Sequence, residues 1–511
     1  MKTIHYRDPL HALSYLWALA TALGLAFSTP AAVAANPASP QSALTAEQAQ
    51  EDVGVLLRSL RALHPALHKY RSPAEMDPAF TGFQADGSAA RTAGAMYLAA
   101  TELAAAIRCG HTWTNVRNQA GAARSTLLDG QDKLPMTMTL VEGRWLVLAS
   151  ADAAVRTGDE VTAINGLSTG QHVTQLMPYL RADGSSDGKR LRQLSHDRPD
   201  TSQVDILLPL LSPPVDGAYQ LNLRIGDGSS KTLRVPATTL AAREQALKAQ
   251  GVSPLDEGWK FQIKGQAGTL VLPSFSFWNS KFDWSGFLDN AFAQLNAQKV
   301  PFLVIDIRNN EGGDGAIGNK LLSHLIRQPL GYYVTQSVTT YERVPPALLP
   351  YLDTWDTRFF DRSGDVEPIN TGTAKGKFQL KSRPPVQRFI APAGATYAGT
   401  TYTLVSAENS SATFVLADLL QRSGAATLVG QPTGGNQRGL NGGQLAWVKL
   451  PHSGVAVDIP LLAARYEENT LDASVTPDVL VVPSFAARLA GTDQEMQAVN
   501  ALIAARKLDA K

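Results

Sequence analysis

The fold is decided by Phe302-Leu-Val-Ile-Asp-Ile-Arg-Asn-Asn-Glu-Gly-Gly313 and by a second stretch, Thr403-Leu-Val-Ser-Ala-Glu-Asn-Ser-Ser411-Ala-Thr-Phe414. In each stretch an apolar run stops at small or helix-capping residues, and a helical pattern follows. Continuous apolar strands that alternate with helices are typical of a sheet that is buried on both faces. The sequence therefore predicts an α/β protein, and its length indicates several domains.

Patterns typical of strands and helices continue on both sides of these two junctions. Strands are expected at Gly268–Phe277, 401–405, 426–429 and Ala446–Pro460, and helices at Phe282–Ala297, 315–326 and 412–422. Before them, residues 134–240 contain short β-type runs, and residues 45–107 show helical spacing that stops at His64-Pro65 and resumes over Ala89–Ile107. Residues 333–395 show no regular pattern.

These changes of character predict the domain organisation. The β-rich part contains Arg156-Thr-Gly-Asp-Glu-Val-Thr-Ala-Ile-Asn-Gly166, which resembles part of a PDZ domain, although most of the usual PDZ pattern is missing. The alternative is a β-rich spacer without a peptide site. We expect a signal peptide over 1–34, a helical domain over 35–125, a PDZ-like β subdomain over 126–245 and an α/β catalytic domain over 255–505.

The N-terminus has the pattern of a secretory signal peptide. Lys2 and Arg7 precede the apolar run Leu13–Phe27, and Ala32-Val33-Ala34 is a small-x-small cleavage site. The apolar run is shorter than the ~20 residues that span a bilayer, which disfavours the alternative of a membrane anchor. We expect a mature chain that starts near Ala35, works in the periplasm or outside the cell, and is not inserted in a membrane.

Composition excludes several classes of protein. The chain is 44% hydrophobic and 18% charged, which is ordinary for a globular protein. Its net charge of +1 gives no reason to expect a nucleic acid partner. Cys109 is the single cysteine, so an intramolecular disulfide is impossible and a cysteine-based metal site is not expected.

Ser411 is the candidate nucleophile. It precedes an amphipathic helical pattern, and a serine in that place is usually only a helix cap. The functional interpretation is that the helix N-terminus favours negative charge beside Ser411, and that the N–H of Ala412 points at a reacting carbonyl.

Asn310-Glu311-Gly312-Gly313 is the candidate oxyanion loop. Glycines after a buried strand let the backbone approach a ligand closely, so Gly312 or Gly313 would supply the second N–H donor. The alternative is a tight strand–helix turn. A phosphate-binding loop is excluded because its lysine motif is absent.

His111 is the candidate base. It lies in the turn Ile107-Arg-Cys-Gly-His111-Thr112, after a helical pattern. Such a histidine is more often a plain surface or core residue. Its ordinary pKa near 6.5 nevertheless suits it to take the proton of a serine.

Read together, these motifs resemble the tail-specific or C-terminal-processing serine peptidases, including the tricorn-core relatives. Val304–Gly313 looks like the oxyanion segment of that family, and Asn409-Ser-Ser411-Ala-Thr looks like its nucleophile segment. Further similarities are Leu428-Val-Gly-Gln-Pro-Thr-Gly-Gly435, Leu450-Pro-His-Ser-Gly454 and Val475-Thr-Pro-Asp478. The resemblance extends over about 50–510.

The departures from the family pattern bear on the mechanism. Asn436 stands where the Ser/Lys branch has its lysine, so the resemblance implies the other branch, with Ser411 as nucleophile and His111 as base. That branch also uses an acidic residue before the Pro-Asp motif. Glu467, Glu468 and Asp472 lie in this window, and Glu468 is favoured. Gln431 replaces the usual glutamate, which leaves room for a repurposed site.

The resemblance thus implies an exported serine endopeptidase that acts on peptides or unfolded proteins through an acyl-enzyme. No metal and no organic cofactor are implied. The alternative is a catalytically weak or inactive protein that binds a ligand on the same fold. Retention of both Ser411 and His111 favours the peptidase. The sequence makes no prediction of oligomeric state.

Overall fold

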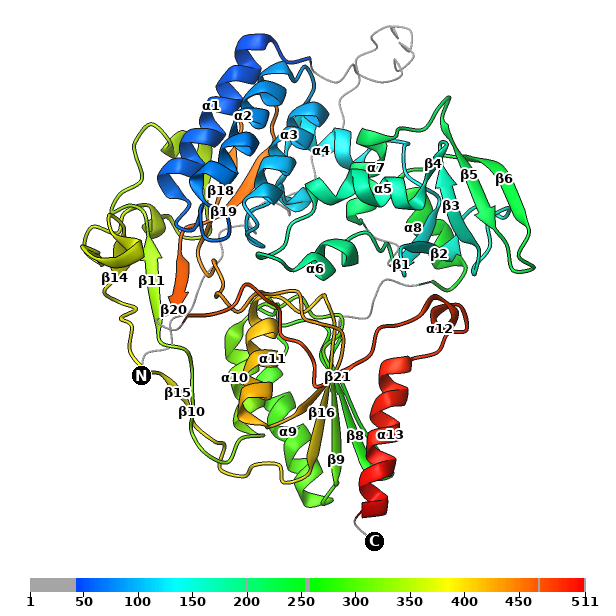
Figure 1. Cartoon of the computed structure of the whole chain (residues 1–511), viewed down its shortest axis with the longest axis vertical. Coiled ribbons are helices and arrows are strands. Elements are labelled where there is room, and N and C mark those ends of the chain that lie inside the picture. The colour runs from blue at the N-terminus through cyan, green and yellow to red at the C-terminus, as the bar shows by residue number, and fades with distance from the viewer. Residues whose placement is uncertain (1–42, 198–200, 253–257, 467–468, 510–511) are drawn as a thin grey trace, which may run out of the picture. The chain divides into compact units, whose positions relative to one another are not determined.

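The computed structural model describes residues 43–197, 201–252, 258–466 and 469–509. N-terminal helices, an antiparallel β unit and a mostly parallel sheet flanked by helices follow one another along the chain (Figure 1). The predicted fold class, α/β with a helical N-terminal part and a buried sheet flanked by helices, is confirmed. The domain boundaries and the PDZ-like character of the β unit stay predictions.

The first helix forms where its cap and its apolar spacing predict it. Thr45 and Gln48 make a capping box, in which each side chain accepts a hydrogen bond from the backbone N–H of the other residue (3.2 and 2.9 Å). The valines and leucines from Val53 to Leu63 are buried, and the helix ends at His64, before proline. The helices of this region are α1 (Ala46–Leu63), α2 (Pro73–Ala89), α3 (Ala93–Ala106) and α4 (Gly121–Leu128).

The prediction of one helix over Ala89–Ile107 was only partly right. Helix α3 covers most of it, but Ala89 is the last residue of α2, which the sequence analysis missed. Pro78 inside α2 obscures its pattern, because proline is strongly unfavourable in a helix interior. The cap at Ser72 and the proline at the first helical position were the available signals.

The β unit is an antiparallel sheet in the order β1-β2-β3-β5-β6, with β4 paired to β3. The outer edge of β1 is partly covered, since Met138 and His196 exchange both backbone hydrogen bonds (2.7 and 2.6 Å). The strands are β1 (Met136–Val141), β2 (Arg144–Ser150), β3 (Glu160–Ile164), β4 (Leu167–Ser168), β5 (Ala218–Arg224) and β6 (Ser230–Pro236). The helices are α5 (Thr169–Leu176), α6 (Asp187–Arg192), α7 (Gln203–Leu211) and α8 (Leu240–Ala249).

The main sheet has the order β21-β17-β16-β9-β8-β7, and all neighbours are parallel except β7 and β8. Its strands are β7 (Lys260–Lys264), β8 (Ala267–Val271), β9 (Phe302–Asp306), β16 (Thr400–Val405), β17 (Thr427–Gly430) and β21 (Val479–Leu480). The accompanying helices are α9 (Trp284–Ala297), α10 (Gly315–Ser323), α11 (Ser411–Ser423) and α13 (Gln494–Asp509). The short helix α12 (Phe485–Leu489) packs instead on the β unit, where Phe485 shares a cluster with Val141 and Leu146.

Both faces of this sheet are buried, as the continuous apolar strands predict. Leu303 and Ile305 of β9 pack into the core that α9, α10 and α11 cover. The alternate residues Phe302 and Val304 pack on the other face, in the cluster that includes Val499 of α13 (Figure 1). This alternation is the two-residue period of a strand covered on both sides.

The run Ala446–Pro460, predicted as a single β stretch, is a hairpin of β18 (Leu445–Lys449) and β19 (Ala456–Pro460). Its buried residues belong to the core of the N-terminal helices rather than to that of the main sheet. The stretch 333–395 contains three single-turn 3-10 helices (Leu349–Tyr351, Thr357–Phe360 and Gly372–Ala374) and several short strands. The strands are β11 (Thr335–Thr339), β12 (Leu352–Asp353), β13 (Val366–Pro368), β14 (Phe378–Leu380) and β15 (Phe389–Ile390), flanked by β10 (Leu330–Gly331) and later by β20 (Ala463–Tyr466), which pairs with β11.

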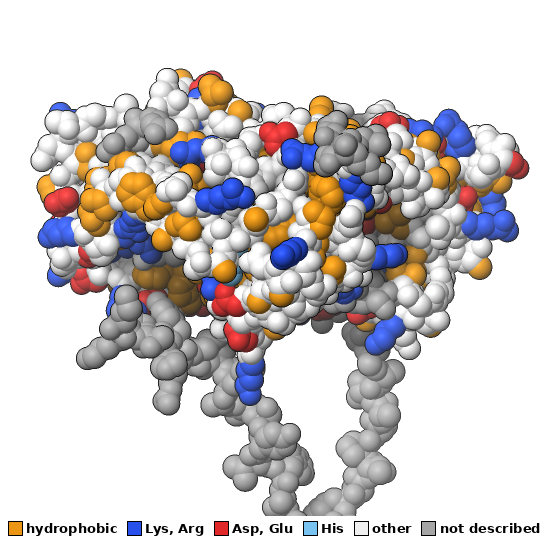
Figure 2. All heavy atoms as spheres, turned by 90° about the horizontal axis from the view of Figure 1, so that it is seen from below, with side chains coloured by type: hydrophobic (Ala, Val, Ile, Leu, Met, Phe, Trp, Pro, Cys, Tyr) orange, Lys and Arg blue, Asp and Glu red, His pale blue; other side chains and the backbone are white. Residues whose placement is uncertain are grey.

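Figure 2 shows one face of the molecule, on which basic and acidic side chains are scattered among apolar and neutral ones. This mixture is in keeping with the small net charge of the chain. In the part of the chain that the structure describes, no helix is both long enough and apolar enough to cross a bilayer.

Candidate active site

The two junctions meet because β9 and β16 are adjacent and parallel. Leu404 lies opposite Asp306 in the register, so both strands end at the same edge of the sheet. The loop after Asp306 and the start of α11 are therefore neighbours. This is the usual place for a ligand site in a sheet of this kind.

Ser411 begins α11 in a strained conformation. Its φ of +52° lies in the left-handed region that few residues other than glycine adopt. The side chain of the preceding Ser410 makes no hydrogen bond that caps the helix. The positive end of the helix dipole at the start of α11 is therefore not covered by a capping side chain. A strained serine at an uncapped helix start indicates a functional role, because a plain cap has no need of the strain.

Asn409 joins the two junctions. Its side chain is fully buried; Oδ1 accepts from the Ser406 N–H (2.7 Å), and Nδ2 donates to the carbonyls of Ile307 (2.5 Å) and Asn310 (3.0 Å). Thr413 of α11 also donates to the Asn310 carbonyl (2.9 Å). The turn at Ser411 is therefore tied to the glycine loop by side-chain hydrogen bonds to the backbone of residues 307 and 310.

The glycine loop approaches Ser411 closely. A Cβ on Gly312 would lie 2.9 Å from the Ser411 Cβ and 3.0 Å from the Ala412 nitrogen, so no larger residue fits there. The N–H of Gly312 donates to Asn310 Oδ1 (2.9 Å). This donor is therefore already engaged within the loop.

Gly313 differs from Gly312 in this respect. Phe275 pairs with this loop as in a parallel ladder, because its N–H donates to the Gly312 carbonyl (3.0 Å) and its carbonyl accepts from the Asp314 N–H (2.9 Å). In such a ladder the N–H of the residue between them, Gly313, points to the side away from Phe275. No hydrogen bond engages it in the described part of the chain.

His111 lies in a tight turn after α3. The Thr112 N–H donates to the Cys109 carbonyl (3.0 Å), and the Thr112 hydroxyl is hydrogen-bonded to the buried His64 (2.8 Å). The imidazole packs on the backbone at Gly442, where a Cβ would come within 3.3 Å of Nε2. Its Nδ1 is buried and has no hydrogen-bond partner among the described residues.

Arg181 and Glu311 connect the turn of His111 to the glycine loop. Arg181 donates to the Gly110 carbonyl and forms an ion pair with Glu311 (2.8 Å). The backbone carbonyl of Glu311 in turn accepts from the Ser410 hydroxyl (3.2 Å). His111 and Ser411 thus belong to one connected group of residues. No hydrogen bond joins their side chains within the described ranges.

Residues 266–481 match the model of peptidase family S41. The matched segment contains both junctions and the main sheet from β8 to β21. It confirms the resemblance seen in the sequence, and the protein is a serine-type peptidase. The search of curated proteins found no match.

Among solved structures, the chain is similar to mature CPAF complexed with lactacystin, with 14% identity, a TM-score of 0.60 and coverage of 90% of this chain and 98% of that one. A second structure of mature CPAF gives 15% identity, a TM-score of 0.55 and coverage of 87% and 94%. The photosystem II D1 C-terminal processing protease gives 16% identity and a TM-score of 0.38, with coverage of 86% of this chain and 94% of that one. The two CPAF matches show that this chain has the same fold as CPAF, and the TM-score of 0.38 adds nothing to that.

The charged group beside the glycine loop is compensated. Lys189 and Arg181 lie 3.0 and 2.8 Å from the same Glu311 oxygen, and Lys189 also pairs with Glu408 (3.0 Å). Partial burial raises the pKa of the Glu311 carboxyl, but the two cations outweigh this effect and hold the pKa well below its ordinary value. Glu311 is therefore ionised at neutral pH.

The environment of His111 keeps its imidazole neutral. Loss of hydrating water lowers the pKa of His111 below the ordinary value near 6.5. The charge of Asp183 opposes this shift, that of Arg181 adds to it, and Glu311 opposes it more weakly. A neutral imidazole is the form that accepts a proton.

The acidic third residue stays a prediction. Glu467 and Glu468 lie outside the described residues. Asp472 is described, and its carboxylate accepts from Asn436 Nδ2 (2.7 Å) and from the Ser185 N–H (2.9 Å) rather than from His111. Asn436, at the lysine position of the Ser/Lys branch, is thus engaged with Asp472.

Sequence analysis missed Arg181, Asp183 and Lys189. Asp183 accepts from the Gly110 N–H (2.8 Å), and Arg181 stacks on Trp113 (3.9 Å from the guanidinium carbon to the ring centroid). All three lie in the part predicted as a PDZ-like subdomain. Their sequence offers only a run of charged and small residues, which by itself is typical of a solvated loop.

Gly313→Ala is expected to abolish peptidase activity. Gly313 has φ +132°, and an added Cβ would lie 2.3 Å from the Phe275 carbonyl carbon, so the loop must move. Loss of one oxyanion donor costs about 10²–10³ in kcat. The control is Gly315→Ala, where an added Cβ meets nothing within 4 Å. Hydrolysis of an unfolded protein is measured beside thermal unfolding; equal activity of both variants would show that the Gly313 backbone has no part in catalysis.

Proposed function

We propose that Ser411 is the nucleophile of a Ser/His endopeptidase and that His111 is its base. The Ser411 hydroxyl attacks the peptide carbonyl as its proton passes to the His111 imidazole. The imidazolium then gives this proton to the leaving amine, which leaves an acyl group on Ser411. Water adds to the acyl carbonyl with the same base, and the released acid regenerates the serine.

The strained Ser411 at the open start of α11, pressed against the glycine loop, is the observation that carries this proposal. Negative charge that develops on the carbonyl oxygen would meet the N–H of Ala412 and the end of the helix dipole. Gly313 is the better second donor, because the Gly312 N–H is already donated to Asn310. Use of Gly312 would require that bond to be shared or broken.

We also propose that the substrates are peptides or unfolded proteins and that the enzyme works in the periplasm or outside the cell. Hydrolysis of peptide bonds is the chemistry of the S41 family. The leader-like residues 1–34 support export, although they lie outside the described part of the chain. Deacylation needs water, which solvent supplies.

Ser411→Ala and His111→Ala are each expected to lower hydrolysis of an unfolded protein at least about a thousandfold, because a serine and its base act as one unit. Ser423→Ala, at the other end of α11, and the exposed His68→Ala are the controls and should keep the parental rate. Thermal unfolding of all four variants shows whether each one folds.

Activity that survives in His111→Ala would exclude this histidine as the base and turn attention to a lysine. Burial lowers the pKa of Lys69 to about 8, which is near the range for a base, although its ammonium donates to the Gly439 carbonyl and to Asn441. No turnover by the parent on any unfolded protein or peptide would favour the ligand-binding alternative.

The pH profile should show the lowered pKa of His111. Activity requires the neutral imidazole, so kcat/KM rises with pH as His111 loses its proton. Because its pKa is lowered, the midpoint of the acid limb is expected below 6.5, and kcat/KM at pH 6.5 should exceed half of its plateau. The profile is measured with an uncharged peptide, and tryptophan fluorescence checks that the fold is intact at each pH. A midpoint above 6.5 would contradict the proposed environment of the base.

Export is tested by producing the protein in a bacterium that has a periplasm and determining the N-terminus of the mature chain. We expect a mature chain that begins at Ala35, recovered in the periplasmic or extracellular fraction, because the small residues Ala32 and Ala34 suit signal peptidase. Mass spectrometry of the intact protein measures the cleavage. A chain that keeps residues 1–34 and stays in the cytoplasm would refute export.

A further inference from the structure

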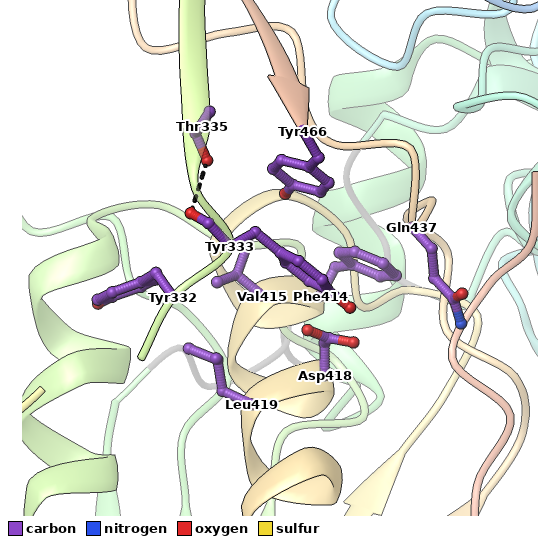
Figure 3. A pocket seen from close by; sticks show the side chains of 9 residues that line it. All are labelled: Tyr332, Tyr333, Thr335, Phe414, Val415, Asp418, Leu419, Gln437 and Tyr466. Atoms are coloured by element: carbon purple, nitrogen blue, oxygen red, sulfur yellow. Dashed lines mark hydrogen bonds between the residues drawn. The ribbon is translucent and has the colours of Figure 1, made fainter. Parts of the chain in front are cut away.

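A small pocket lies along α11, outside the constellation described above (Figure 3). Its volume is about 40 Å³. The wall comes from α11, from the segment leading into β11, from the end of β20 and from the loop after Asn436. The lining residues are Tyr332, Tyr333, Thr335, Phe414, Val415, Asp418, Leu419, Gln437 and Tyr466.

The pocket continues the helix face on which Ser411 lies. Helix residues three, four, seven and eight positions apart share one face. Counted from Ser411, these positions are Phe414, Val415, Asp418 and Leu419, which are the four α11 residues of the lining. Phe414 and Val415 lie one helical turn from Ser411, a rise of about 5.4 Å. A residue adjacent to a carbonyl held at Ser411 is within reach of this pocket.

The chemistry of the lining is mainly apolar and aromatic. Tyr333 stacks on Tyr466 with ring centroids 4.6 Å apart, and the guanidinium of Arg422 lies 4.0 Å from the centroid of Tyr333. Asp418 is the acidic member, and Arg422 already faces it at 3.6 Å. Burial raises the pKa of the Asp418 carboxyl, while Arg422 opposes this. A second cation would compete with Arg422, so a neutral side chain fits better than lysine or arginine.

We propose that this pocket binds the side chain of the substrate residue that flanks the scissile bond, and that it prefers aliphatic side chains of the size of valine or leucine. The proposal rests on Ser411 being the nucleophile. A cavity of about 10–15 Å³ holds one water molecule. A pocket of about 40 Å³ therefore accepts a few heavy atoms, which suits a branched aliphatic group. The peptide backbone then runs across the N-terminus of α11 with its carbonyl at Ser411.

The test uses a set of fluorogenic peptides that differ only at the residues flanking the cleaved bond, which mass spectrometry identifies. Leucine or valine is expected to give a kcat/KM at least about tenfold above glycine or lysine at the pocket-facing position, because one or a few methylenes in an apolar pocket are worth about 10–200-fold. The position at which leucine or valine is preferred also shows whether the pocket binds the residue before or the residue after the scissile bond.

Val415→Phe fills the pocket and should reduce the advantage of leucine over glycine to less than about twofold. Val415→Ala enlarges it and should shift the preference toward phenylalanine. The control is Val482→Phe, the same change at a valine that is 61% exposed and lies outside the lining. Thermal unfolding accompanies each variant.

Two outcomes would overturn the pocket assignment while the peptidase proposal stands: no aliphatic preference in the parent, or an equal loss on all peptides in Val415→Phe. A preference for lysine would also overturn it, and would assign Asp418 to recognition of a cation. Labelling of Ser411 by a fluorophosphonate reports on the serine without using this pocket. If Ser411 is not labelled and no peptide is cleaved, the proposed function fails, and the pocket as a substrate subsite fails with it.

Discussion

The parallel pairing of β9 with β16 is the constraint on which the site depends. It places the ends of two strands at one edge, and the buried Asn409 fixes the loops that follow by hydrogen bonds to both. A slip of one residue would exchange the two faces of β9, and its apolar residues would face the wrong helices. The pairing therefore determines that Ser411 and the glycine loop lie together, and the apolar faces of the sheet keep the register in place.

The parts of the site that sequence predicted are local ones. The strand β9, the glycines after it and the serine at the start of α11 each leave a pattern within a few residues. Arg181 and Lys189 left none, because their role exists only when the β unit meets Glu311. The hairpin β18–β19 was missed for another reason. Pro451-His-Ser-Gly454 between its strands is a local turn signal, which the reading of one continuous β run passed over. Sequence thus predicts the fold better than the contacts between its regions.

The proposed base, His111, and the proposed nucleophile, Ser411, are supported by different cores. Ser411 begins a helix that packs on the main sheet, whereas His111 follows α3 and lies beside Trp113, whose backbone pairs with Asp458 of β19. Strands β18 and β19 pack with the N-terminal helices, so the chain contributes to the core of these helices from two distant parts of its sequence. Small shifts between the two cores would change the distance from imidazole to hydroxyl. The absence of a direct bond between His111 and Ser411 within the described ranges fits a site whose last contact forms when substrate binds.

Glu311 shows how the two cores are held in relation to each other. A carboxylate next to the glycines of an oxyanion loop would oppose the negative charge that develops there, unless its own charge is compensated. Lys189 and Arg181 provide this compensation, and Arg181 also holds the Gly110 carbonyl beside His111. The same ion pairs that compensate the charge beside the proposed oxyanion loop thus position the turn that carries His111. Glu311 is tolerated beside the loop because it links the two halves of the site, which an apolar residue at this position would not do.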